Sequence, residues 1–207
     1  MTHLGKLFTD GPNASAGATR LRALILGTGV GPPPAGSAVE LDTLALVGRL
    51  AYCAYRDYQQ GRPTWGTGTA QASMLLSPPG GSGFELGAVT HATAILLIRA
   101  MIAGADAAGP IGSVERQDLL KRLRHAGLEG GARHFLGCEF DKPASVAELA
   151  RAVRSPAEGA QVFTAARIAM DPVRSDGRAF LVALAARLGI SNRLAAHINA
   201  AARSTGR

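Results

Sequence analysis

The sequence predicts an all-α fold of about seven helices, and three features support this prediction. Aromatic residues make up only 5% of the chain, alanine is abundant, and the β-branched and aromatic runs typical of strands are scarce. Serine followed three residues later by glutamate, a spacing that caps helices, precedes apolar segments. A helix–loop–helix pattern also occurs twice, in residues 106–128 and 171–190.

The two copies of this pattern share three positions. In each copy an apolar helix ends at an Asp, a loop follows, and a second helix begins near an Arg that lies eleven residues before a terminating Gly. The shared positions are Asp106, Arg116 and Gly127 in the first copy, and Asp171, Arg178 and Gly189 in the second. Neither half can bury its apolar face alone, so we expect one compact bundle with an internal pseudo-repeat.

Composition divides the chain into four segments. Three consecutive prolines stop any helix in the first segment, and Gly, Pro, Ser and Thr dominate the third. Between these segments, apolar residues recur at steps of three and four, as on one face of a helix. The predicted segments are residues 1–38, mostly disordered; 39–60, an amphipathic helix; 61–83, a flexible linker; and 84–207, the helical domain.

Start and stop residues place the helices of this domain. Ser145 and Glu148 have capping-box spacing, and Ser155 and Glu158 repeat it with Pro156 at the first helical position. The first helix is apolar nearly all round, so we expect it to lie centrally. The expected helices span residues 84–105, 113–127, 132–140, 145–154, 156–170, 175–188 and 191–202.

The net charge of +7 suits anionic partners such as phospholipid headgroups or nucleic acid. No run of Lys and Arg reaches the density of a nucleic-acid-binding arm, so we expect no specific nucleic-acid partner. We find no signal peptide and no run of the ~20 apolar residues that span a membrane. The expected location is therefore the cytoplasm.

Motifs of catalysis are not evident in the sequence. The Gly27–Gly29–Gly31 spacing is followed by prolines, which supply no N–H groups for a dinucleotide phosphate. No GxSxG or HExxH motif occurs, and we predict no enzyme activity and no organic cofactor. Cys53 and Cys138 are interpreted as free thiols in a reducing compartment. The five His residues are interpreted as structural, with no close Cys partner.

Loop carboxylates form the one candidate metal site. Asp106 and Glu115 flank the first inter-helix loop, and Asp171 begins the second. Carboxylates at such loops can supply oxygen ligands to Ca²⁺ or Mg²⁺, so a divalent cation is the one cofactor we consider. The alternative is that these acids end and cap the helices.

The predicted helix 39–60 carries a candidate contact surface. Tyr52, Tyr55 and Tyr58 follow one another at three-residue steps, with Arg49 and Arg56 nearby. Aromatic and basic residues on one helix suit an anionic membrane surface or a protein partner. The alternative is that this helix packs on the bundle or self-associates.

Residues 84–202 resemble the TerB-like family, named for a tellurite-resistance protein, and more closely the uncharacterised bacterial group that contains the inner-membrane protein YebE. The first-half match is Ala105-Asp106, Ile111, Glu115-Arg116 and Gly127-Leu128. The second-half match is Met170-Asp171, Arg178, Phe180-Leu181, Leu184-Ala185 and Leu188-Gly189-Ile190. Residues 50–59, LAYCAYRDYQ, match the group's helix before the domain. The second half departs at Val173 and Gly177, where the relatives have Asp and Glu.

The resemblance implies a TerB-like helical fold and an acidic surface linked, in TerB itself, to divalent metal binding. We therefore predict a non-enzymatic interaction module, stress-related and peripheral to the inner membrane. The alternative is a divalent-metal-binding stress module that uses Asp106, Glu115 and Asp171. The sequence sets no oligomeric state.

Overall fold

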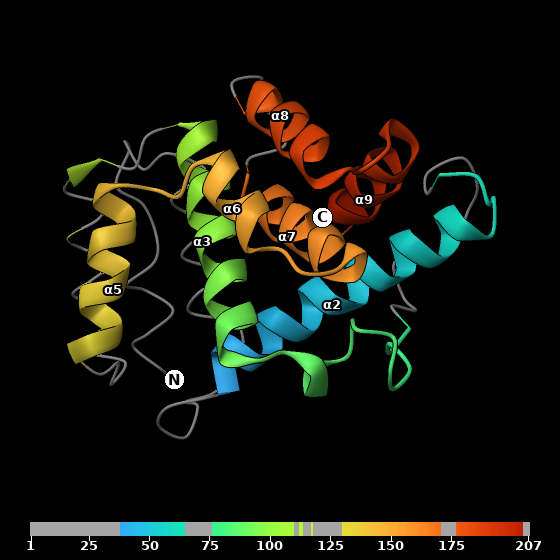
Figure 1. Cartoon of the computed structure of the whole chain (residues 1–207), viewed down its shortest axis with the longest axis horizontal. Coiled ribbons are helices and arrows are strands. Elements are labelled where there is room, and N and C mark those ends of the chain that lie inside the picture. Colours follow the sequence, from blue (N-terminus) through green and yellow to red (C-terminus); the bar gives the residue numbers. More distant parts are fainter. Residues whose placement is uncertain are drawn as a thin grey trace, which may run out of the picture.

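The computed structural model describes residues 38–64, 76–109, 112–113, 117, 130–170 and 177–204. These described residues form seven α-helices and one 3₁₀ turn and contain no strand, which confirms the all-α prediction (Figure 1). The elements are α2 (Ala38–Gln59), η2 (Leu86–Ala88), α3 (His91–Ala108), α5 (Gly130–Asp141), α6 (Val146–Ala152), α7 (Pro156–Ala169), α8 (Arg178–Leu188) and α9 (Asn192–Ser204). Three predicted segments lie wholly or partly outside the described residues. They are the disordered segment 1–38, except for Ala38 at the start of α2, residues 65–75 of the predicted linker 61–83, and most of the predicted helix 113–127.

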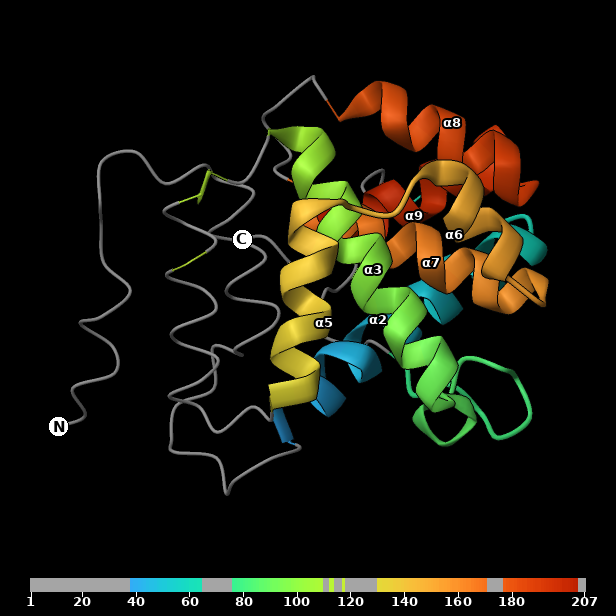
Figure 2. The ribbon, with the colours of Figure 1, turned by 60° about the vertical axis from the view of Figure 1, so that its left-hand side comes forward.

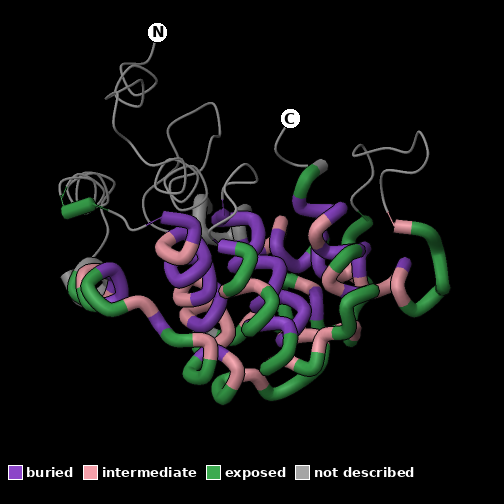
Figure 3. Tube along the Cα trace, turned by 90° about the horizontal axis from the view of Figure 1, so that it is seen from above, coloured by how far each residue is buried: buried purple, intermediate pink, exposed green. Residues whose placement is uncertain are grey.

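Helix α7 is the centre of the bundle. Every residue from 159 to 169 is buried, because α2, α3, α8 and α9 all pack against this helix. Figure 1 shows α7 between α3 on one side and α9 on the other, with α2 running beneath. In Figure 3 the buried positions gather in the middle of the described helices, and the exposed positions lie on the outer turns. The expected central helix was α3, but α7 is the more completely enclosed.

Helices α3 and α7 make the closest backbone contact in the core. A Cβ added at Gly104 would clash with the carbonyl oxygen of Ala166 and lie 3.0 Å from its Cα atom. Near the start of both helices, Thr93 Oγ1 donates a hydrogen bond to Glu158 Oε1 at 2.9 Å. The two contacts come in the same order along α3 and along α7, so the two helices run in the same general direction. The apolar helices that lead to Asp106 and Asp171 therefore bury each other, as the pseudo-repeat predicts.

Helix α2 is part of the same core. Leu44, Val47 and Leu50 are buried in one apolar cluster with residues of α3, α7 and α9. Gly48 meets the backbone of Phe84, which follows the tight turn at Gly83. Gln161 of α7 holds that turn, because its Nε2 donates to the carbonyl oxygen of Gly83 at 2.7 Å. The sequence left open whether this helix docks on a membrane or partner, packs on the bundle or self-associates; in the structure it packs on the bundle.

Side-chain caps explain where α3, α6 and α7 begin. Ser145 and Glu148 form the predicted capping box of α6, and Ser155 accepts a hydrogen bond from the backbone of Glu158 at the start of α7. The predicted start of the first domain helix near Phe84 was wrong. Thr90 caps α3 instead, and Phe84 is a buried residue that lies just before the η2 turn.

Substitution of Gly104 tests the α3–α7 contact. We expect Gly104→Ala to force the two backbones apart and lower the free energy of unfolding by about 1–3 kcal/mol. Gly137→Ala on α5 is the matched control, because nothing lies within 4 Å of its added Cβ. There the helix propensity of alanine should raise stability by up to about 1 kcal/mol. Urea denaturation of both variants checks this, and equal effects would contradict the close contact.

Candidate functional site

The five candidate contact residues of α2 do not share one free surface. Arg49 is exposed, whereas Tyr52 and Tyr55 are half-buried. Their ring centroids lie 5.9 and 5.5 Å from that of Phe84. Tyr58 is also half-buried, and its ring lies in a T-shaped arrangement with the His197 ring, with 6.4 Å between the ring centroids. The tyrosines therefore join α2 to the bundle in the described structure.

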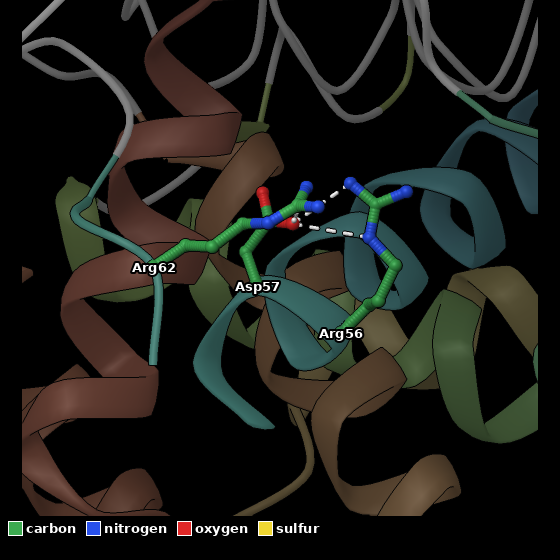
Figure 4. Close-up of polar contacts among 3 residues, drawn as sticks. All are labelled: Arg56, Asp57 and Arg62. Carbon is green, nitrogen blue, oxygen red and sulfur yellow. Dashed lines mark hydrogen bonds and ion pairs between the residues drawn. The ribbon is translucent and has the colours of Figure 1, made fainter. Parts of the chain in front are cut away.

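Arg56, the fifth candidate, belongs to an ionic cluster that sequence analysis missed. Asp57 is only 4% exposed, and its Oδ1 accepts hydrogen bonds from Arg56 Nε at 3.0 Å and Nη2 at 2.7 Å. Arg62 Nη1 lies 3.4 Å from the same oxygen. Figure 4 shows both guanidinium groups reaching the one carboxylate. We call these three residues the Asp57 cluster. Sequence spacing gives little warning of it, since Arg62 lies beyond the end of the helix.

The Asp57 cluster fixes the end of α2. The backbone N–H of Arg62 donates to the carbonyl oxygen of Asp57 at 3.0 Å, and Gly61 turns the chain with a φ of 67°. Burial raises the pKa of the neighbouring Cys53 thiol, which keeps it protonated and unreactive. The role of the cluster is structural, because both arginines bind the carboxylate of Asp57 and do not line an open pocket.

His197 of α9 faces this end of α2 from the bundle interior. It is 1% exposed, and neither ring nitrogen has a hydrogen-bond partner within the described part of the chain. Burial lowers the pKa of His197; the Asp57 charge opposes this shift, and Arg193 adds to it. The ring is therefore neutral in the folded protein. Arg193 also lies over the Tyr58 ring, 5.9 Å from its centroid.

The loop carboxylates are only partly described. Asp106 is half-exposed in the last turn of α3, and its carbonyl oxygen accepts a hydrogen bond from the Gly109 N–H at 3.0 Å. Glu115 and Asp171 lie outside the described residues. Within the described ranges, no three His, Cys, Asp or Glu side chains converge where they could hold a metal ion. Metal binding by the three carboxylates stays a prediction.

A shallow hollow lies where the first turns of α3 and α7 meet the end of α6. Its volume is about 220 Å³, and it is lined by Ala92, Leu96, Arg151, Ala152, Arg154 and Glu158. Both carboxylate oxygens of Glu158 are already engaged. One accepts from Thr93 Oγ1 at 2.9 Å, and the other accepts from the backbone N–H of Arg154 at 2.8 Å. Glu158 therefore connects the first turn of α7 with the first turn of α3 and with the segment that follows α6.

One pair of side chains corrects the sequence analysis. We expected no His to have a close Cys partner, but His134 Nε2 lies 3.7 Å from Cys138 Sγ on α5. Both side chains are exposed. Side chains four residues apart on a helix lie on the same face. The spacing of His134 and Cys138 within the predicted helix 132–140 could therefore have revealed this pair.

The outer side of α8 is an exposed apolar helix face. Val182 is 65% exposed, and three exposed alanines lie on the same side. We call this set the α8 face: Ala179, Val182, Ala183 and Ala186. Exposed Arg178 and Arg187 stand at the two ends of the helix. Figure 2 shows α8 along the upper edge of the bundle, away from α5.

Comparison with known proteins identifies a family of unknown function. The family model described as a protein of unknown function, DUF533, matches residues 10–202, which include every described helix except the last two residues of α9. The chain belongs to the DUF533 family. No curated protein and no solved structure matches the chain. In this DUF533 chain, no described helix is long and apolar enough to cross a membrane.

The buried imidazole makes the stability of this DUF533 protein depend on pH. The unfolded chain protonates His197 near a pKa of about 6.5, whereas the folded chain resists protonation because its pKa is lower. The stabilising contribution is therefore present above about pH 6.5 and is lost as the pH falls from there toward the folded pKa. We expect wild type to lose stability between pH 7.5 and about 5.5, and His197→Phe to lose less. His134→Gln, which alters an exposed imidazole, should follow wild type in urea denaturation. Identical pH slopes for wild type and His197→Phe would contradict the assignment.

The Asp57 cluster can be tested by removing each charge. Asp57→Asn leaves the half-buried Arg56 without its counter-ion, so we expect a loss of about 1–3 kcal/mol in the free energy of unfolding. Arg62→Gln should cost less than about 1 kcal/mol, because a half-exposed ion pair is well screened. Thermal or urea unfolding at pH 7.5 measures both. The account fails if Asp57→Asn is neutral, or if both changes cost the same.

Proposed function

We propose that this DUF533 protein is a non-enzymatic helical interaction module of the TerB-like type, nearest to the YebE-like group. The contact surface is the α8 face, and its partner is an acidic amphipathic helix of another protein. The observation that carries the proposal is that α8 is apolar on its exposed side as well as its buried side. A helix that is apolar all round normally lies inside a protein or beneath a partner.

The sequence of α8 contains no polar residue except its two arginines. Leu184 and Ala185 anchor the inner side in the core, while the α8 face looks outward. Helix α8 packs on α6 and α7, so the bundle holds this face in a fixed orientation. A surface that is rigid before binding loses less conformational entropy when a partner docks.

The small side chains of the α8 face favour a helix as the occupant. Alanines at three- and four-residue steps allow another backbone to approach closely, as in packed helix pairs. Arg178 and Arg187 at the two ends suit carboxylates on the partner, which would set its direction. An anionic membrane is the competing occupant. The face offers it only small apolar groups, whereas helices that insert at lipid interfaces use large ones.

Three of the reactive groups support the non-enzymatic part of the proposal, although His134 and Cys138 are exposed. Cys53 and His197 are buried, and Glu158 in the shallow hollow already has two partners. The resemblance to TerB-like proteins supports a role in stress, and the net charge of +7 supports work at the anionic inner-membrane surface. The alternative, a divalent-cation module built on Asp106, predicts heat of binding on titration with Ca²⁺ or Mg²⁺ that Asp106→Asn removes.

Site-specific photocrosslinking tests the proposed surface. A photoreactive amino acid at position 182 of the full chain, expressed in its own cells, should capture one protein through an acidic helical segment. The same residue at the exposed position 147 of α6 is the matched control and should not capture it. Val182→Glu should abolish co-purification of the captured protein, because it opposes the partner's charge, whereas Ala147→Glu should not. Capture of lipid, or equal capture at both positions, would contradict the proposal.

A further inference from the structure

The His134–Cys138 pair on α5 has the geometry of half a metal site. Sγ and Nε2 lie 3.7 Å apart. Zinc binds cysteine sulfur at about 2.3 Å and histidine nitrogen at about 2.0–2.1 Å, and tetrahedral angles then separate the two ligand atoms by about 3.6 Å. The two side chains therefore stand at the spacing that one zinc ion would impose, without rearrangement of the helix.

The bundle holds this pair on the outer side of α5. Leu136 and Phe140 are buried on the inner side. Glu139 is also inward and pairs with Arg99 of α3, with Oε1 2.8 Å from Nε. At 100° per residue, His134 and Cys138 point away from these inner positions. Figures 1 and 2 show α5 at one edge of the described bundle, beside α3. The ligands are thus fixed by a packed helix and open to solvent.

The ligand types select the metal. A thiolate and an imidazole favour Zn²⁺ and similar borderline ions, whereas Ca²⁺ and Mg²⁺ require oxygen ligands. Structural zinc sites hold four protein ligands. The described residues bring no third His, Cys, Asp or Glu to this pair. A second copy of the chain related by a two-fold axis would supply an identical pair and complete a Cys₂His₂ set.

We propose that His134 and Cys138 bind Zn²⁺, and that two copies of the chain share one ion through these residues. On binding, each Cys138 thiol gives its proton to solvent, and the resulting thiolate donates its electron pair to zinc. The neutral His134 ring donates through Nε2. This site does not depend on the α8 face, and it differs in ligand type from the carboxylates around Asp106.

Metal titration of the full chain under reducing conditions tests the site. With Co²⁺ as a spectroscopic probe, we expect a thiolate-to-cobalt charge-transfer band that Zn²⁺ displaces. Zinc should convert monomer to dimer in sedimentation experiments with one ion per two chains, and a chelator should reverse the change. Cys138→Ser and His134→Gln should each weaken Zn²⁺ binding by at least about tenfold.

Two controls separate this site from the alternatives. Cys53→Ala removes the buried thiol and Asp106→Asn removes the loop carboxylate; neither should change the cobalt band or the dimer. Exposed positions tolerate substitution, so Cys138→Ser and His134→Gln should unfold like wild type without metal. A cobalt complex without the thiolate band, or zinc affinity unchanged in both variants, would overturn the site. Binding of one ion per monomer would overturn the shared arrangement.

Discussion

The close approach of α3 and α7 is the contact on which the rest of the structure depends. Gly104 has no side chain, so the α3 backbone can rest on the carbonyl of Ala166. This contact leaves the other sides of α7 free for α2, α8 and α9, and it leaves the outer side of α3 free for α5. The candidate surfaces inherit their positions from this arrangement, because α8 packs on α7 and α5 is ion-paired to α3.

The pseudo-repeat extends further upstream than the sequence pattern indicated. Thr93 and Glu158 are 65 residues apart and hydrogen-bonded to each other. The capping residues Thr90 and Ser155 have the same separation, as do Asp106 and Asp171. Each cap accepts a hydrogen bond from the residue three positions on. Both halves thus begin at matching caps, but their helices end differently. Helix α3 continues past Asp106 to Ala108, whereas α7 ends at Ala169, before Asp171.

Sequence analysis succeeded where the determining interactions are local. The capping box at Ser145 and the cap at Ser155 involve neighbours three residues apart, so their spacing is visible in one dimension. The sequence could not predict what α2 packs against, because an amphipathic pattern shows that one face of a helix is buried but not which elements cover it. The Asp57 cluster depends on how the chain turns back at Gly61 after α2 ends, and the burial of His197 depends on α2 meeting α9, so both required the packed structure.

Native-state hydrogen exchange tests the central claim most directly. If α3 and α7 form one packed unit, the slowest amides of residues 96–105 and 160–169 should exchange only through global unfolding. Their exchange free energies should match each other and the free energy of unfolding from urea denaturation. A separate, lower-energy opening that exposes α3 while α7 stays protected would contradict the account.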